Sequence, residues 1–247
     1  MRSLRFGWSA VLIFVVTGCG GKADSPAPAD TRGVASPSAS VPPSAAAETK
    51  PAEPTVETPF ELEEGFKLLS FDDFAAFTAD EALPTPWSAT ETGLICAGKP
   101  KGYLYSKGPY QNFTWRLEYR FPRPPKLTDD EKFKGNTGFL VFITGDHKLW
   151  PICLEVQGKF VQMGAIKENG GANPVVASID EAERQKARKP VGEWNSLEIV
   201  AKAGALNVSL NGMSISHSEP NFLSEGLIGI QAEDHPFEVR RMRIRAD

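Results

Sequence analysis

Residues 135–157 read GNTGFLVFITGDHKLWPICLEVQ and contain two apolar runs of the kind that form neighbouring β-strands. The first run covers residues 139–143, the second covers residues 152–157, and the polar connection between them carries turn signals. In the second run, apolar side chains alternate with polar ones that include Glu155 and Gln157. Because successive side chains of a strand point to opposite faces, we expect Glu155 and Gln157 to share the polar face of a sheet. Any half-buried strand shows such alternation, so the pattern alone assigns no function.

The rest of residues 60–247 continues as short β-type runs separated by Gly, Pro, Asn and Asp. Residues 113–120 (FTWRLEYR) have the clearest alternation, and Asn211-Gly212 is a strong signal for a hairpin turn. Residues 180–189 form the one helical stretch, acidic first and basic last, as the helix dipole prefers. Ten to twelve strands with one short helix and no repeat predict an all-β fold, a two-sheet antiparallel jelly-roll sandwich.

The chain begins with the features of a secretory signal peptide over residues 1–18, which has a basic start, an apolar middle and a small-residue end. Its apolar run is shorter than the roughly 20 residues that a membrane-spanning helix needs. Residues 16–19 (VTGC) resemble the lipobox of bacterial lipoproteins, which implies that Cys19 carries lipid. Gly20 follows Cys19 and implies retention at the outer membrane. We therefore expect a protein of the cell envelope that is tethered by a lipid without spanning the membrane.

Residues 19–59 connect this predicted anchor to the globular part of the chain. They are rich in proline and alanine, and their few apolar side chains are scattered without a period. Such a segment buries too little surface to offset the entropy cost of ordering, so we expect a disordered linker. The predicted folded domain is therefore residues 60–247.

Charge and cysteine usage limit the classes of partner. The formal net charge is −4 and Lys and Arg form no cluster along the chain, so nucleic acid is not expected as a partner. Cys96 and Cys153 lie in strand-like apolar runs. In an oxidising compartment they can pair or remain buried thiols, and the sequence leaves both alternatives open.

Eight short blocks in the predicted domain, in this order, resemble the 3-keto-disaccharide hydrolase family. They are residues 65–69 (GFKLL), 113–120 (FTWRLEYR), 136–138 (NTG), 155–157 (EVQ), 192–195 (GEWN), 210–212 (LNG), 226–231 (GLIGIQ) and 237–244 (FEVRRMRI). The resemblance implies a concanavalin-like jelly roll that cleaves glycosides whose glucose carries a ketone at C3. Some members of the family resemble 1,2-lyases and others resemble hydratases of the unsaturated product.

The sequence differs from the family pattern at two places. Phe142 stands near a position where the family often has arginine, and Val239-Arg240-Arg241 replaces a common Phe-Arg-Asn motif. These departures leave open a different substrate or a loss of activity.

The chemistry that the resemblance implies requires few groups. A C3 ketone acidifies the proton on C2, so a base can remove that proton and the enolate can expel the group on C1, after which water can add back. The protein must supply the base and must stabilise the enolate charge. If the polar faces of their strands line one cavity, we expect Glu155 to be the base and Arg120 the enolate stabiliser. Glu118 then holds Arg120 or acts as a second acid.

The sequence also offers candidates for contacts with sugar hydroxyl groups, namely Gln157, Asn136, Gln231, Glu238, Arg240 and His147. For Asn136 a role in the turn before its strand is the alternative. We expect Trp115 and Trp194 to belong to the core. No cofactor is expected, because His147 and His217 lack the HxH or HExxH spacing typical of a metal site, although a divalent metal stays an alternative.

Two other function classes stay open for residues 60–247. One is a non-catalytic, carbohydrate-binding surface lipoprotein, because concanavalin-like folds also host lectins. The other is a structural surface lipoprotein. Turnover of a ketosugar separates the enzyme from both of them.

Overall fold

The structure is a computed structural model that describes residues 59–247. The predicted signal peptide, the predicted lipid on Cys19 and nearly all of the predicted linker lie outside the described residues. No helix within residues 59–247 is long and apolar enough to cross a membrane.

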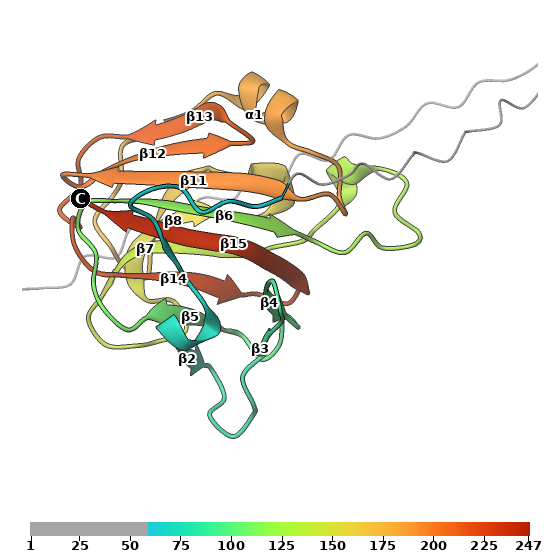
Figure 1. The fold of residues 1–247 in the computed structure, drawn as a ribbon, viewed down its shortest axis with the longest axis horizontal. Coiled ribbons are helices and arrows are strands. Elements are labelled where there is room, and N and C mark those ends of the chain that lie inside the picture. Colours follow the sequence, from blue (N-terminus) through green and yellow to red (C-terminus); the bar gives the residue numbers. More distant parts are fainter. Residues whose placement is uncertain (1–58) are drawn as a thin grey trace, which may run out of the picture. The chain divides into compact units, whose positions relative to one another are not determined.

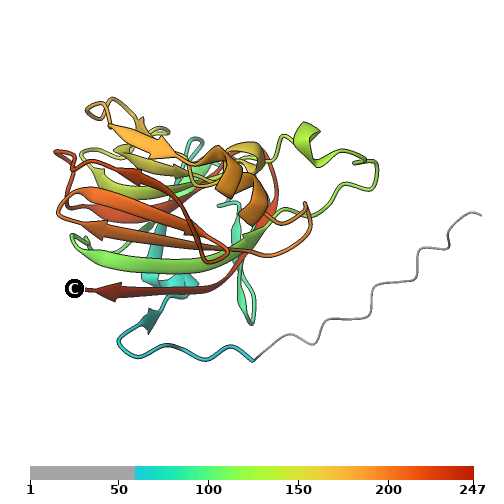
Figure 2. The same cartoon turned by 90° about the horizontal axis from the view of Figure 1, so that it is seen from above.

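Two antiparallel sheets form the domain (Figure 1), and Figure 2 shows them stacked as two layers. The larger, nine-stranded sheet contains, in order, β10 (Ala177–Ile179), β13 (Met213–Ser218), β12 (Ala205–Leu210), β11 (Asn195–Lys202), β6 (Phe113–Arg120), β15 (Phe237–Ala246), β4 (Gly93–Cys96) and β3 (Trp87–Ala89), with β1 (Lys67–Leu68) also paired to β15. The smaller, six-stranded sheet contains β2 (Phe74–Thr78), β5 (Gly102–Ser106), β14 (Leu227–Ala232), β7 (Gly138–Thr144), β8 (Ile152–Gln157) and β9 (Ile166–Asn169). The prediction of a two-sheet jelly-roll sandwich is confirmed.

One α-helix, α1 (Glu181–Ala187), lies within the stretch predicted as helical. Asp180 caps it by accepting a hydrogen bond from the backbone N–H of Glu183, and Arg188 is already extended. Three short 3₁₀ turns complete the elements, η1 (Phe71–Asp73), η2 (Asp130–Lys132) and η3 (Phe160–Gln162). The sequence missed β2, β9 and β10, which are short strands at the sheet edges with no clear alternation of apolar and polar side chains.

The predicted hairpin joins β12 to β13. Asn211 and Gly212 have φ angles of 49° and 83°, the two positive values that a type I′ turn requires. The Asn211 side chain also accepts a hydrogen bond from the N–H of Ser196 and donates one to the carbonyl of Ala187. The hairpin is thereby fastened to β11 and to the end of α1.

The core lies between the two sheets and determines which side chains face outward. Trp115 and Tyr119 of β6 are fully buried there, and the ring of Phe139 on β7 meets both at centroid distances of 6.0 and 4.9 Å. Leu154 and Val156 of β8 belong to the same core. The side chains that alternate with these residues must point to the two outer surfaces.

The chain before β1 crosses the outer surface of the larger sheet (Figure 1) and is fastened by Glu63. This carboxylate accepts two hydrogen bonds from Arg243, of 2.5 and 2.6 Å, and one of 3.1 Å from Arg116. The Arg243 bond lowers the pKa of Glu63 to about 2. The Phe60 and Phe66 rings lie beneath arginine guanidinium groups of the same surface.

Both remaining cysteines are free thiols. Cys96 lies in the core between the sheets, whereas Cys153 belongs to a second apolar cluster on the other side of the smaller sheet. The smaller sheet therefore separates the two thiols, and the structure favours the unpaired alternative.

Candidate functional site

The predicted catalytic residues divide between the two outer surfaces of the sandwich. Glu118 and Arg120 flank the buried Tyr119 on β6 of the larger sheet. Glu155 lies between the core residues Leu154 and Val156 on β8 of the smaller sheet. Because each strand turns its apolar side chains toward the shared core, the polar side chains point away from one another. The expectation that Glu118 and Arg120 share a cavity with Glu155 is wrong.

On the larger sheet, the predicted residues form cross-strand ion pairs. Glu118 accepts hydrogen bonds from Arg240 Nε at 2.7 Å and from Arg241 at 3.0 Å, while Arg120 donates to Glu238 at 2.9 Å. The Trp194 ring lies 4.5 Å from the Arg120 guanidinium and 4.0 Å from that of Arg240. Trp194 is therefore a partly exposed stacking surface, and its predicted core position is wrong, whereas that of Trp115 is confirmed.

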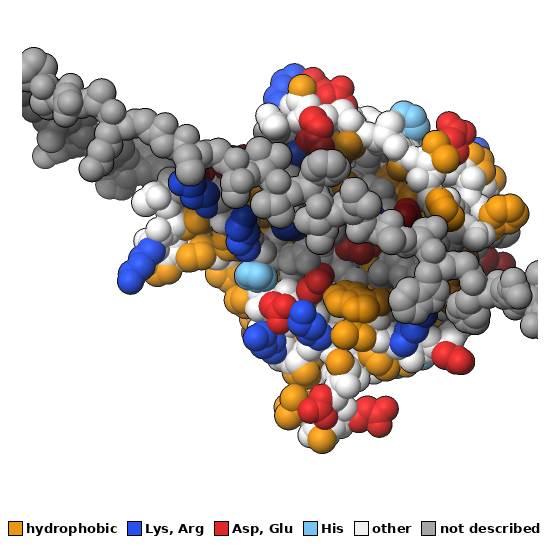
Figure 3. Space-filling view, turned by 180° about the vertical axis from the view of Figure 1, so that it is seen from behind, with side chains coloured by type: hydrophobic (Ala, Val, Ile, Leu, Met, Phe, Trp, Pro, Cys, Tyr) orange, Lys and Arg blue, Asp and Glu red, His pale blue; other side chains and the backbone are white. Residues whose placement is uncertain are grey.

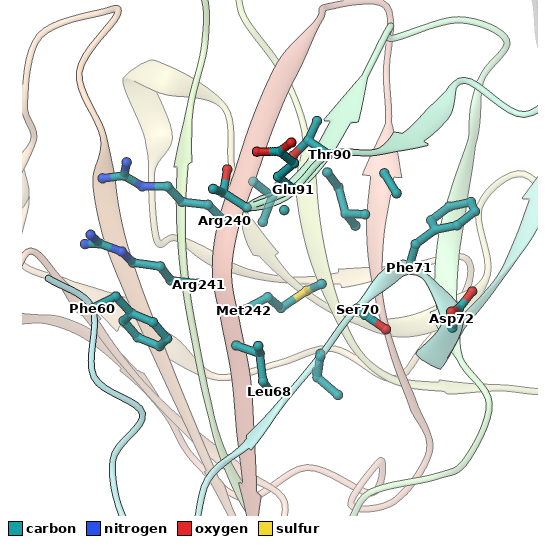
Figure 4. A pocket seen from close by; sticks show the side chains of 16 residues that line it. Phe60, Leu68, Ser70, Phe71, Asp72, Thr90, Glu91, Arg240, Arg241 and Met242 are labelled. Carbon is teal, nitrogen blue, oxygen red and sulfur yellow. The ribbon is translucent and has the colours of Figure 1, made fainter.

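A cavity of about 520 Å³ adjoins these arginines (Figure 4). It lies between η1, the β3–β4 turn and β15, and apolar side chains such as Leu68, Leu94 and Met242 line much of it. In Figure 4, Arg240 and Arg241 point to one side of it, and Phe71 and Asp72 lie on the other. This cavity is on the opposite outer surface from Glu155.

The smaller sheet carries five of the predicted residues, namely Glu155, Gln157, Gln231, Asn136 and His147. Glu155, Gln157 and Gln231 are 8%, 7% and 2% exposed. Gly138 on β7 lies beside Gln157 in the strand register, and a Cβ atom there would meet Gln231 Oε1 at 2.3 Å and Glu155 Oε1 at 2.5 Å. The missing side chain of Gly138 thus lets these two oxygens approach the same point. Asn136 lies two residues before Gly138, on the same side of the chain.

Glu155 has the electrostatics of a proton acceptor that works near neutral pH. Burial raises the pKa of its carboxyl to about 7, with a further increase from the negative charge of Glu233 and a decrease from Lys167. Lys167 lies directly opposite Glu155 on β9. A carboxylate with this pKa is ionised in a substantial fraction of molecules at pH 7 and still binds a proton readily.

Two buried amide oxygens have no hydrogen-bond partner within the described part of the chain, and that of Gln231 lies beside Glu155. Gln231 Oε1 and Asn136 Oδ1 are both buried and unpaired, whereas Gln157 Oε1 accepts a bond of 2.8 Å from the N–H of Lys159. Buried polar groups in proteins are nearly always paired, so each of these oxygens can accept one further hydrogen bond. The two alternatives for Asn136, sugar contact and a role in the turn, both stay open.

An aromatic wall adjoins the amides. Tyr103 lies opposite Gln231 on β5, and its hydroxyl is 2.8 Å from His147 Nδ1. The His147 ring lies 4.1 Å from the Tyr105 ring, and Phe77 stacks on Tyr103 at 5.2 Å. Tyr103 is fully buried, so the Tyr105 and His147 rings are the ones that can stack against the apolar face of a sugar. The sequence placed His147 here but missed both tyrosines.

Figure 3 shows the face of the molecule opposite to that in Figure 1, where acidic and basic side chains lie among hydrophobic ones around the part that grey atoms cover. His217 is not part of the Glu155 surface, because it lies on β13 of the larger sheet beside Ser178. Within residues 59–247, no three His, Cys, Asp or Glu side chains are grouped to hold a metal ion. The alternative set of His147, His217 and Glu155 is not brought together.

Phe142, which stands near a position where the family often has arginine, lies in the core. Its side chain is fully buried in the core against Phe113, and its φ angle is 61° at an irregularity in the pairing of β7 with β8. This position therefore turns its side chain away from the Glu155 surface.

The comparisons with known proteins agree with the fold. Among solved structures, a "putative glycosyl hydrolase" from Parabacteroides distasonis ATCC 8503 is 20% identical with a TM-score of 0.52, over 74% of this chain and 99% of that one. A second structure of this description from the same organism is 16% identical with a TM-score of 0.53, over 74% and 94% of the two chains. No curated protein sequence matches. At these identities the likeness shows the fold alone.

The family is shown by a match that spans most of the described domain. The profile of the 3-keto-alpha-glucoside-1,2-lyase-like domain matches residues 68–245, from β1 to the last residues of β15. This range includes every residue of the Glu155 surface described above. The chain therefore belongs to the 3-keto-alpha-glucoside-1,2-lyase-like domain family.

Proposed function

We propose that this protein is a glycoside-cleaving enzyme that acts on 3-keto-glucosides and uses Glu155 as the base that removes the proton on C2. The observation that carries the proposal is a buried carboxylate with a pKa of about 7 beside the unpaired amide oxygen of Gln231, in a domain of this family. Structural ion pairs also perturb pKa values, but burial is the largest cause of the shift of Glu155, and the nearby charge of Lys167 acts against it.

The reaction begins when Glu155 takes the C2 proton and the electron pair moves toward the C3 ketone. The negative charge that develops on the C3 oxygen needs a cation or a hydrogen-bond donor nearby. Lys167, opposite Glu155 on β9, and the amide of Gln231 are the candidates on this surface. When the enolate collapses, the bond from C1 to the aglycone breaks, and addition of water to the unsaturated sugar gives net hydrolysis.

The remaining polar groups position the sugar. The Asn136 and Gln231 amides can bind hydroxyl groups because their oxygens are unpaired within the described residues. The Tyr105 and His147 rings provide apolar contact for a sugar ring, whereas Tyr103 is fully buried and holds His147 in place through its hydroxyl. Holding the C2–H bond against the Glu155 carboxylate in this way removes much of the entropy cost of proton transfer.

The test is to offer the full-length chain a 4-nitrophenyl 3-keto-glucoside in both anomeric forms, with the unoxidised glucosides as the matched control. We expect release of 4-nitrophenol from a ketosugar and none from the glucosides, because only the ketone acidifies C2. Saturable binding of the ketosugar without release supports the non-catalytic carbohydrate-binding alternative. If the protein neither binds the ketosugar nor releases 4-nitrophenol from it, the proposal is overturned.

The larger-sheet surface gives a second prediction. Replacing Glu118 with glutamine removes the carboxylate that Arg240 and Arg241 share. The side chains of these two arginines are 14% and 21% exposed. We expect a loss of about 2 kcal/mol in the free energy of unfolding, because the bonds from Arg240 and Arg241 to Glu118 are both charge-assisted hydrogen bonds. Cleavage of the ketosugar should stay within about twofold of the wild type, since Glu118 is on the surface opposite Glu155.

Urea unfolding and initial rates on the same preparation measure both quantities. If the Glu118→Gln protein is folded but cleaves the ketosugar a hundredfold more slowly, the active site lies on the larger sheet and not beside Glu155.

A further inference from the structure

A second carboxylate faces the Glu155 surface and has no role in the reaction so far. Glu233 follows directly after β14 and lies two residues beyond Gln231. Ala232, between them, is 2% exposed and belongs to the core. Because side chains alternate, Glu233 and Gln231 leave the chain on the same side, which is the side that carries Glu155.

We propose that Glu233 is the second acid–base group of this site and that it protonates the oxygen that leaves C1. The inference rests on the proposed function, because it assigns the other half of the same elimination. It replaces Glu118, which the sequence offered for this role and which the fold places on the opposite surface.

The geometry supports this pairing of carboxylates. Gln231 lies between Glu233 along β14 and Glu155 across β7, and the two oxygens of Gln231 and Glu155 approach one point above Gly138. A sugar that lies against the Gln231 and Glu155 oxygens therefore has one carboxylate toward β8 and the other toward the end of β14. Neither carboxylate is engaged in an ion pair or a hydrogen bond within residues 59–247.

The charges around Glu233 are consistent with a group that exchanges protons. Burial raises the pKa of its carboxyl, and the charge of Asp234 raises it further, whereas Lys101, Lys159 and His235 lower it. The negative charge of Glu233 in turn raises the pKa of Glu155. Two carboxyl groups that repel one another in this way favour the state in which one is protonated and the other is ionised.

The proposed step balances within this pair. Ionised Glu155 takes the C2 proton, the C2 electron pair forms the C1–C2 double bond as the C1–O bond breaks, and protonated Glu233 gives its proton to the departing oxygen. The products are an alcohol and a C1–C2 unsaturated 3-ketosugar, with Glu155 now protonated and Glu233 ionised. Hydration reverses these roles, since Glu233 takes a proton from water that attacks C1 and Glu155 returns its proton to C2. No oxidant or reductant is required.

The experiment compares two leaving groups in the full-length chain, 4-nitrophenyl 3-keto-glucoside and methyl 3-keto-glucoside. Nitrophenolate leaves without protonation, whereas methoxide does not. We therefore expect Glu233→Gln to keep 4-nitrophenol release within about fivefold of the wild type and to lower methanol release at least a hundredfold, the usual size of general acid catalysis. Glu233→Asp should recover part of the methanol release.

The matched control is Glu219→Gln, an exposed glutamate beyond β13, which should leave both rates unchanged. Thermal unfolding of each variant verifies that it is folded. Equal slowing of both substrates by Glu233→Gln indicates a structural role and overturns the inference, as does a variant that cleaves both at the wild-type rate. If the wild-type chain cleaves neither ketosugar, the proposed function itself is overturned. This outcome differs from one in which the wild type is active but Glu233→Gln affects both substrates equally.

Discussion

Replacing Glu155 with glutamine is expected to abolish cleavage of 3-keto-glucosides while making the protein more stable above neutral pH. Glutamine has nearly the same shape but cannot accept the C2 proton. The loss of a general base lowers the rate by about 10²- to 10⁴-fold. In the wild type, kcat/KM for the 4-nitrophenyl ketosugar, whose leaving group needs no proton, should rise with pH through the Glu155 pKa of about 7, because only the ionised form can act as the base.

The gain in stability follows from the same pKa. Burial raises the pKa of Glu155 from 4.5 to about 7, so between these values the unfolded chain releases a proton that the folded chain retains. The free energy of unfolding therefore falls as pH rises from 4.5, and the loss is complete above about pH 7. A shift of this size corresponds to about 3 kcal/mol for a side chain that is 8% exposed. Glu155→Gln carries no such charge and avoids the loss.

Urea unfolding of wild type and variant at pH 5 and pH 8, together with initial rates, measures both effects. The stability difference should be small at pH 5 and large at pH 8, and Glu219→Gln serves as the exposed control. An active Glu155→Gln protein excludes Glu155 as the base. If Glu155→Gln is inactive but gains no stability at high pH, then burial does not raise the pKa of Glu155 in the wild type.

Much of the fold could be predicted because its signals are local. The alternation of residues 113–120 marks β6, and the Asn211-Gly212 pair marks a type I′ turn, since each depends only on neighbouring residues. β9 and β10 could not be recognised, because they are short and their pairing partners β8 and β13 determine that they are strands. Trp194 was misplaced because its surroundings depend on arginines from two other strands.

The site was only partly predictable, since alternation tells which residues share a face but not on which side of a sandwich that face lies. Glu118 and Glu155 have the same local pattern, yet strand order places β6 and β8 in different sheets. Glu155, Gln157 and Gln231 were found because their sequence blocks resemble the family. Glu233 and Lys167 were missed because their proximity to Glu155 exists only across strand pairs.

Adding a single methyl group at Gly138 is expected to lower the rate of ketosugar cleavage about a hundredfold with little effect on folding. A Cβ there would meet Gln231 Oε1 at 2.3 Å and the Glu155 carboxyl at 2.5 Å, closer than such atoms can pack. These atoms are the far ends of flexible side chains, so they can move aside and the backbone can stay in place. A displacement of about 1 Å at a reacting group is enough for a hundredfold loss.

The matched control is Gly108→Ala, because a Cβ at Gly108 has no atom within 4 Å. The free energy of unfolding of both variants should be within about 1 kcal/mol of that of the wild type, since each substitution adds only one methyl group. The rate of Gly108→Ala should equal that of the wild type, and that of Gly138→Ala should fall through kcat more than through KM, because the base is displaced rather than removed. If Gly138→Ala is folded and fully active, then Glu155 and Gln231 need not meet above this glycine, and proton transfer must take place elsewhere on the smaller sheet.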